Sequence, residues 1–123
     1  MAQILVIDDD SSLRTTIRRI LTAAGHVVLE AGDGDAGLEL LKQHEPVIVI
    51  TDIYMPNKQG IETIREIRRL NPDIKIAAMS GGSVSGNEPI LLWAQRTGAD
   101  AILPKPFRST ELVDTVNRLL SGE

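Results

Sequence analysis

The chain has 123 residues, of which 42% are hydrophobic and 24% are charged, a size and balance typical of one globular domain. It contains no cysteine, which excludes disulfides, thiolate metal sites and cysteine nucleophiles. The formal net charge of −4 disfavours nonspecific binding to nucleic acid or to anionic membranes. No apolar run is long enough to span a membrane, and the first residues do not resemble a signal peptide, so we expect a cytoplasmic protein.

Strand and helix patterns alternate along the whole chain. Strands are predicted over residues 3–8, 27–31, 47–52, 75–79 and 101–103. A helix is predicted after each strand: the first capped by Ser11 or Ser12, the second by Asp33, the third starting at Ile61, the fourth over about 88–97, and the fifth capped by Ser109. The segment 81–87 is rich in glycine and serine and is predicted to be a loop.

The apolar pattern predicts how these elements pack. The runs Ile4–Ile7 and Val47–Ile50 have no polar break, which predicts strands buried on both faces, as in a parallel sheet. The predicted helices each carry an apolar stripe, made up of Leu13, Ile17, Ile20, Leu21 and Ala24 in the first, Ala36, Leu40 and Leu41 in the second, Ile61, Ile64 and Ile67 in the third, and Leu112, Val113, Val116, Leu119 and Leu120 in the last. The arginines at positions 14, 18, 19, 68 and 69 are predicted to point away from these stripes, and those at 18, 19, 68 and 69 are predicted to lie on solvated faces. The alternation predicts an α/β domain with a parallel sheet and helices on both of its faces.

Polar residues of particular kinds stand where four of the five strands end. They are Asp8 and Asp9 after the first strand, Asp52 after the third, Ser80 after the fourth and Lys105 after the fifth. The carboxyl ends of parallel strands meet at one edge of the sheet, so these side chains are expected to converge there. Carboxylates that lie so close repel one another, and a hard divalent cation such as Mg²⁺ relieves the repulsion.

These five residues have the chemistry needed for phosphoryl transfer. With the cation, the Lys105 ammonium and the Ser80 hydroxyl on the phosphoryl oxygens, an oxygen of Asp52 can attack phosphorus in line. Catalysis of this kind depends on positioning and electrostatics.

The strand-end motifs together resemble the receiver domain of two-component response regulators. They are Val-Ile-Asp8-Asp9-Asp10, Thr-Asp52-Ile-Tyr-Met-Pro56, Met-Ser80-Gly, Gly98-Ala99-Asp100 and Lys105-Pro106-Phe107, and they cover essentially the whole chain. The resemblance implies a flavodoxin-like doubly wound fold with strand order 2-1-3-4-5. It also implies one receiver domain over residues 1–123, without an output domain.

The resemblance further implies the role of each site residue. Asp52 would accept a phosphoryl group from a sensor histidine kinase or a histidine phosphotransfer protein, and a downstream protein would read the change. Mg²⁺, or in its place Mn²⁺, would be bound by Asp9, by Asp8 directly or through water, by Asp52, and by the backbone carbonyl of Tyr54. Ser80 would be the switch hydroxyl and Lys105 the phosphate-binding cation, with a cis bond between Lys105 and Pro106.

The sequence departs from the receiver pattern in two places. Ile102 occupies the position where receivers usually carry an aromatic switch residue, so signalling is expected to rely on Ser80 and its loop. The segment between Ser80 and Gly98 is also longer than in chemotaxis receivers, so the 81–87 loop is expected to differ. Tyr54 and Gly82 occupy positions that resemble rate-tuning sites, where a bulky Tyr54 would lengthen the phosphorylated lifetime.

Two alternatives stay open. A haloacid-dehalogenase-type phosphatase uses similar groups, but it needs an acid two residues after the nucleophile, where this chain has Tyr54. A receiver-like domain that binds partners without phosphorylation is favoured only by Ile102 and the altered loop. We expect a signalling switch with no turnover of metabolites, and a possible dimer through the fourth helix, fifth strand and fifth helix.

Overall fold

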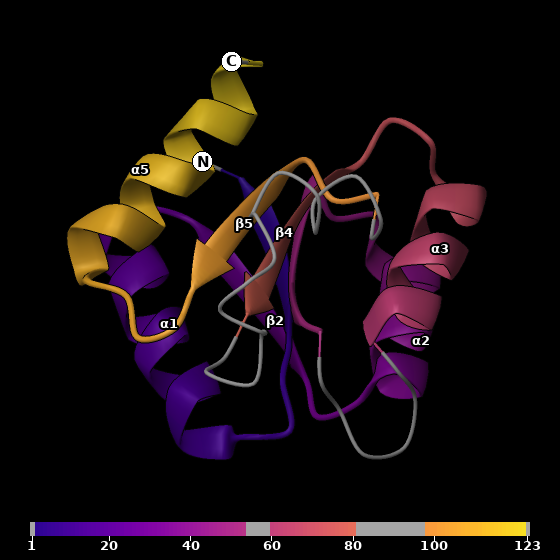
Figure 1. Ribbon diagram of the computed structural model, residues 1–123, viewed down its shortest axis with the longest axis horizontal. Helices are drawn as coiled ribbons and strands as arrows, with labels where there is room; N and C mark the ends of the chain where they lie inside the picture. The colour runs from indigo at the N-terminus through magenta and orange to yellow at the C-terminus, as the bar shows by residue number, and fades with distance from the viewer. Residues whose placement is uncertain (1, 54–59, 81–97, 123) are drawn as a thin grey trace, which may run out of the picture.

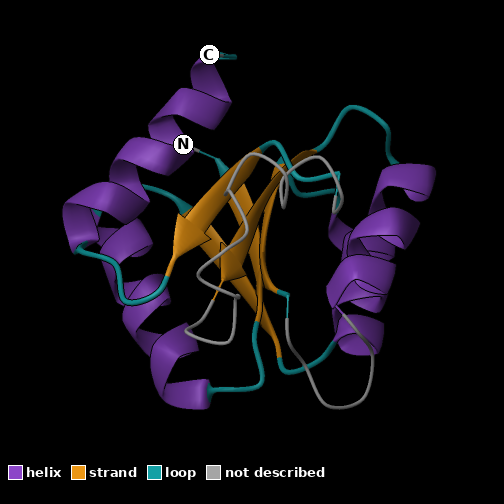
Figure 2. Ribbon diagram, viewed as in Figure 1, coloured by secondary structure: helices purple, strands orange, loops and turns teal. Residues whose placement is uncertain are grey.

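The structure, a computed structural model, describes residues 2–53, 60–80 and 98–122. Its five strands are β1 (Gln3–Ile7), β2 (Val27–Ala31), β3 (Ile48–Asp52), β4 (Lys75–Ser80) and β5 (Ala101–Pro104). They form one sheet in the order β2-β1-β3-β4-β5, and every neighbouring pair is parallel (Figure 2). The predicted fold class and strand order are confirmed.

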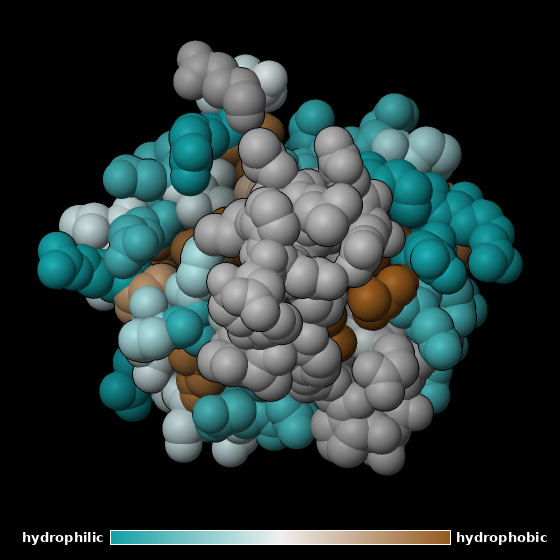
Figure 3. All heavy atoms as spheres, in the orientation of Figure 1, coloured by the Kyte–Doolittle hydropathy of each residue, from teal (hydrophilic) through white to brown (hydrophobic). Residues whose placement is uncertain are grey.

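Helices cover both faces of the sheet. Helices α1 (Ser11–Ala23) and α5 (Ser109–Ser121) lie on one face, and α2 (Gly34–His44) and α3 (Gly60–Leu70) lie on the other (Figure 1). Hydrophilic side chains cover most of the outer flanks, as expected for amphipathic helices (Figure 3). The helix predicted over about 88–97 lies outside the described residues. No helix in the described part of the chain is long and apolar enough to cross a membrane.

The sheet separates two hydrophobic clusters, and β1 contributes to both. Ile4 and Val6 pack with α1 and α5, whereas Leu5 and Ile7 pack with α2 and α3. This alternation follows from the two-residue repeat of a strand. The predicted burial of the third strand is correct from Ile48 onward. It is wrong for Val47, which precedes β3 and is 49% exposed.

Two predicted helix caps are wrong. The N-cap of α1 is Asp10, whose carboxylate accepts hydrogen bonds from the backbone N–H groups of Ser12 and Leu13 at 3.0 and 3.2 Å. A carboxylate suits this position because it also faces the positive end of the helix dipole. Ser109 is the first residue of α5, and Glu111 accepts a hydrogen bond from the Arg108 N–H at 2.9 Å. The predicted cap of α2 is confirmed, since Asp33 accepts from the Ala36 N–H at 2.8 Å.

Some predicted inward positions face solvent. They are Ala24, Ala36 and Leu120, each of which lies at the margin of an apolar stripe. The face of α2 that meets the sheet contains Gly37 and Leu38 instead of Ala36. A Cβ atom on Gly37 would lie within 3.0 Å of the Ile7 side chain, so α2 approaches β1 through a glycine. The sequence pattern identified the helix and placed Leu40 and Leu41 correctly on its contact face, but it missed Gly37 and Leu38.

Arg68 joins three segments at the edge of the sheet opposite the predicted site, which corrects its assignment to a solvated face. Its guanidinium donates to the carbonyls of Pro72, Ile74 and Gly98 at 3.1, 2.7 and 3.0 Å, and to Asp100 Oδ2 at 2.9 Å. The same Asp100 oxygen accepts from the Ile76 N–H at 2.8 Å. Arg68 therefore connects the C-terminal part of α3 to the segments that lead into β4 and β5.

We expect Arg68→Ala to lower the free energy of unfolding by about 2 kcal/mol, because several charge-assisted hydrogen bonds are lost and their carbonyls lose partners. Urea unfolding followed by circular dichroism measures the change. Arg69→Ala, at the next and exposed position of the same helix turn, is the matched control and should change stability by less than about 0.5 kcal/mol. Equal effects of the two substitutions would contradict this role.

Candidate functional site: an acidic pocket at the carboxyl edge of the sheet

The predicted site residues that the structure describes meet at the carboxyl edge of the sheet. Asp8 directly follows β1, Asp52 is the last residue of β3, Ser80 is the last of β4, and Lys105 follows β5. Asp8 is fully buried, and Asp52 and Ser80 are each 7% exposed. These four residues lie at the carboxyl ends of neighbouring strands, so the order β1-β3-β4-β5 brings together positions that are far apart in sequence.

Lys105 connects the two buried carboxylates. Its Nζ lies 2.9 Å from Asp8 Oδ2 and 3.0 Å from Asp52 Oδ2. Its backbone N–H donates to the Ser80 carbonyl at 2.8 Å, and the Lys105–Pro106 peptide bond is cis. Burial alone would lower the pKa of Lys105, but the hydrogen bonds to Asp8 and Asp52 outweigh it and raise this pKa above its ordinary value. Lys105 is therefore held as a cation.

Asp9 completes a cluster of three carboxylates. One oxygen each from Asp8, Asp9 and Asp52 lies within 4.8 Å of the others. Asp9 itself is exposed, and Asp8 Oδ1 accepts from the Asp10 N–H at 2.9 Å. Desolvation and then the hydrogen bond and charge of Asp8 raise the pKa of Asp9. The folded protein therefore disfavours the ionised form of Asp9 compared with the unfolded chain.

The donor set of this cluster fits a hard divalent cation. All three groups are carboxylates, and neither histidine nor cysteine belongs to the cluster, which favours Mg²⁺ over softer metals. Asp8, Asp9 and Asp52 are the residues that would hold it. The further ligand expected from the sequence, the carbonyl of Tyr54, lies outside the described residues, as does Gly82.

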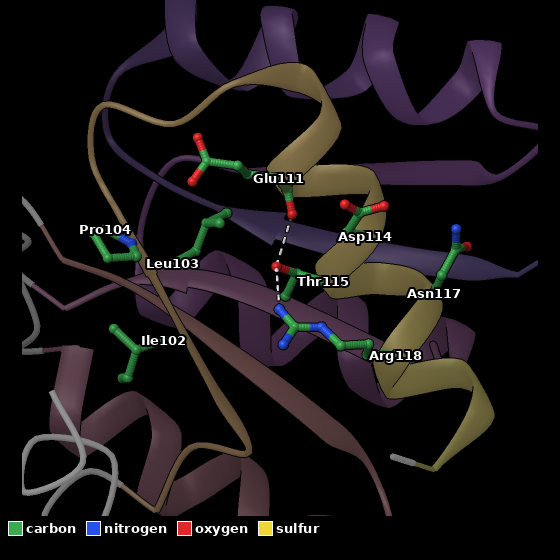
Figure 4. A pocket seen from close by; sticks show the side chains of 8 residues that line it. All are labelled: Ile102, Leu103, Pro104, Glu111, Asp114, Thr115, Asn117 and Arg118. Carbon is green, nitrogen blue, oxygen red and sulfur yellow. Dashed lines mark hydrogen bonds between the residues drawn. The ribbon is translucent and has the colours of Figure 1, made fainter.

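The switch position Ile102 lies on β5, on the same face of the sheet as Ala78 and Ser80. Ile102 pairs with Ala78 in the β4–β5 register and packs against the α2–α3 cluster. Leu103 points to the opposite side, toward α5 (Figure 4). A hollow of about 510 Å³ separates this stretch of β5 from the polar side of α5, where Thr115 donates to the Glu111 carbonyl at 2.8 Å. This is part of the predicted dimer surface, whose remaining helix lies outside the described residues.

Sequence reasoning missed Gly60, which the structure places at the start of α3. A Cβ atom there would lie within 3.0 Å of the carbonyl oxygens of Asp52 and Ile53, and the Gly60 N–H donates to the Ile53 carbonyl at 2.8 Å. The helix therefore begins in contact with the backbone that carries Asp52. The only sequence signal was a glycine directly before the predicted start of the third helix, and a glycine there suits any turn.

Sequence reasoning also missed the role of Arg14, which was predicted only to point away from the apolar stripe of its helix. The Arg14 guanidinium donates to the backbone carbonyl of Asp8, and its Nε lies 3.4 Å from Glu30 Oε1 on β2. The side chain is 19% exposed. Arg14 therefore belongs to the surroundings of the pocket.

Comparison with known proteins identifies the family. The sequence profile of the response regulator receiver domain matches residues 4–117. The chain is 33% identical to the chemotaxis protein CheY of Thermotoga maritima, covering 95% of this chain and 96% of CheY. It is 34% identical to the transcriptional regulator NtrC of Azospirillum brasilense, but it spans only 24% of that protein.

Solved structures agree with this assignment. A receiver domain protein from Clostridium thermocellum superposes with a TM-score of 0.89 at 30% identity, over 99% of this chain and 96% of that one. The chemotaxis protein CheY4 of Vibrio cholerae gives 0.87 at 27% identity, over 97% and 98%. The chain therefore belongs to the response regulator receiver family, with an acidic pocket formed by Asp8, Asp9, Asp52 and Lys105.

We expect Gly60→Ala to lower the free energy of unfolding by about 3 kcal/mol, because the added methyl group would meet backbone atoms of Asp52 and Ile53 that cannot move aside cheaply. Urea unfolding measures it. Gly32→Ala is the control, since its Cβ would have only an ordinary contact of 3.5 Å with Arg14 Nη1. A Gly60→Ala protein as stable as the Gly32→Ala protein would refute the steric account.

We expect Asp9→Asn to stabilise the protein at neutral pH in the absence of divalent cations. An acid with a raised pKa in the folded state costs stability when ionised; the cost is fully present above the folded pKa and absent below the unfolded value of 3.8. The advantage of the variant should therefore shrink as the pH falls toward 4. Urea unfolding between pH 7 and pH 4 tests this, with Asp73→Asn at the other end of the sheet as control. A variant that is no more stable than the native protein at pH 7 would overturn it.

Proposed function

We propose that this receiver domain accepts a phosphoryl group on Asp52 from a phosphohistidine of a sensor histidine kinase or a histidine phosphotransfer protein. Phosphorylation would then change its interaction with a downstream protein in a two-component system. Family membership supports the kinase as the class of partner. The observation that carries the proposal is the contact of Lys105 with both Asp8 and Asp52. This contact places the Lys105 cation next to Asp8, the acid that would bind the metal, and next to Asp52, the nucleophile.

The transfer breaks the P–N bond of phosphohistidine and forms a P–O bond to an oxygen of Asp52. The electron pair of the broken bond stays on the histidine nitrogen, which then takes up a proton. The transferring group carries negative charge on its equatorial oxygens. Lys105 would donate to one of these oxygens, and the Ser80 hydroxyl would bond another. When bound, Mg²⁺ would supply positive charge that neutralises the phosphoryl group.

The proposal also accounts for a switch. Ser80 is the last residue of β4, Lys105 directly follows β5, and the Lys105 N–H donates to the Ser80 carbonyl at 2.8 Å. A phosphoryl group that accepts hydrogen bonds from both side chains would therefore affect the ends of two adjacent strands, β4 and β5, at the same time. Attack of water on the acyl phosphate would return the domain to its unphosphorylated state. Tyr54 and Gly82 would influence the rate of this hydrolysis.

The acidic pocket supports this proposal better than a phosphatase of the haloacid-dehalogenase type. Such an enzyme needs an acid two residues after its nucleophile to protonate the leaving group, and this chain has Tyr54 at that position. A histidine leaving group needs no acid placed there. The site therefore favours a domain that phosphorylates itself from a donor over one that turns over phosphate esters.

The test is the intact mass of the protein after incubation with acetyl phosphate, with and without Mg²⁺. We expect one added phosphoryl group that depends on Mg²⁺ and is absent in Asp52→Asn. Asp114→Asn, an equal change in charge on the exposed side of α5, should be phosphorylated like the native protein. No adduct at short sampling times, or an adduct that persists in Asp52→Asn, would overturn the proposal.

A further inference from the structure

Arg14 lies between the acidic loop and the edge strand β2. Its guanidinium donates to the Asp8 carbonyl, and its Nε is buried, 3.4 Å from Glu30 Oε1 and without a hydrogen-bond partner. Arg18, one turn further along α1, also approaches Glu30, with 3.5 Å between its Nη1 and Glu30 Oε2, but it is 49% exposed. The two arginines thus share one acidic partner, while only Arg14 has a hydrogen bond to the loop.

The carbonyl that Arg14 binds belongs to the peptide group joining Asp8 to Asp9. The other polar groups of Asp8 have partners of their own: its N–H donates to the Ala31 carbonyl at 3.1 Å, and its carboxylate binds the Asp10 N–H and Lys105. Asp8 is fully buried, so a carbonyl without a donor there would be costly. Arg14 supplies that donor, and the orientation of this peptide sets where both carboxylates point.

We propose that Arg14 is a positioning residue for the metal-binding carboxylates, fixing the Asp8–Asp9 peptide while Glu30 holds the guanidinium in place. This inference rests on the proposed function, because it assigns Arg14 a role in cation binding by the same pocket. The planar guanidinium suits the task, since it offers donors in two directions at once. Outer-shell contacts of this kind commonly set the affinity of a metal site.

The sign of the effect separates positioning from simple electrostatics. A guanidinium bound to the Asp8 carbonyl, beside the acidic cluster, repels a cation there, so if Arg14 acted only through its charge, its removal would tighten metal binding. If Arg14 holds the ligands in place, its removal weakens binding although a positive charge is lost. The two accounts therefore predict opposite changes in the same measured constant.

The experiment measures binding of Mn²⁺ to the whole protein by the electron paramagnetic resonance signal of free Mn²⁺. Arg14→Gln should raise the Kd about tenfold. Arg18→Gln, with the same loss of charge and the same partner Glu30, should leave the Kd within about twofold of the native value. An unchanged or lower Kd for Arg14→Gln, or an equal rise in Arg18→Gln, would overturn the inference.

A second readout needs no metal. The Asp10 N–H, bonded to Asp8 Oδ1, should exchange with deuterium faster in Arg14→Gln than in the native protein and at the native rate in Arg18→Gln. Equal rates in all three proteins would count against the proposal. If Arg14→Gln does not fold, Arg14→Lys replaces it: the charge is kept, but the fork that spans Asp8 and Glu30 is lost. Mn²⁺ affinity should still fall, and native affinity would overturn the proposal.

The outcomes also separate this inference from the proposed function. A native protein that binds no Mn²⁺ and takes no phosphoryl group would refute the proposed function and, with it, the role of Arg14. A native protein that does both, while Arg14→Gln binds Mn²⁺ equally well, would refute the role of Arg14 alone.

Discussion

The repulsion among three carboxylates at one edge of the sheet is the constraint on which the rest of this structure depends. Oxygens of Asp8, Asp9 and Asp52 lie within 4.8 Å of one another, and two of these residues are buried. Lys105 offsets part of the repulsion, although it comes from a strand three places away from β1, on the order of 14 Å by strand spacing. The turn after β5 must therefore carry the ammonium across the ends of two intervening strands, which makes the strand order a requirement of the site.

Backbone contacts hold the charged groups in place. Asp52 ends a strand whose exit touches the first residue of α3, where only a glycine fits. Asp8 is held by an N–H bond to the edge strand and a carbonyl bond to Arg14, and Lys105 by an N–H bond to Ser80. Each of these contacts fixes the backbone next to one of the charged side chains of the pocket. Repelling groups stay close because the main chain leaves them little freedom to separate.

The fold and the convergence of the site residues were predictable because both follow from the local spacing of apolar residues along the sequence. Uninterrupted apolar runs indicated buried parallel strands, and parallel strands bring their ends to one edge. The roles of Arg14 and Gly60 were not predictable, because each depends on a distance between elements that the local sequence does not encode. An arginine off the apolar stripe is normally solvated, and a glycine after a loop is normally a turn residue. The error at the α1 cap has a different origin, because the cap is a local contact of Asp10 with Ser12 and Leu13, and Asp10 was assigned only to the acidic motif.

The charge balance of the pocket links its stability to its chemistry. Three carboxylates against one ammonium leave two net negative charges, the charge that one divalent cation neutralises. Desolvation, and after it the hydrogen bond and charge of Asp8, raise the pKa of Asp9 within this cluster. A ligand that binds only the folded state stabilises it in proportion to the logarithm of its concentration over its Kd, so a bound cation should offset the cost of the acidic cluster. Under the proposed function, an incoming phosphoryl group would add negative charge, which the Lys105 ammonium would partly neutralise. Since Lys105 already joins Asp8 to Asp52, under the proposed function a phosphoryl oxygen bound to it would redistribute its hydrogen bonds, starting just after β5, next to the Ser80 carbonyl.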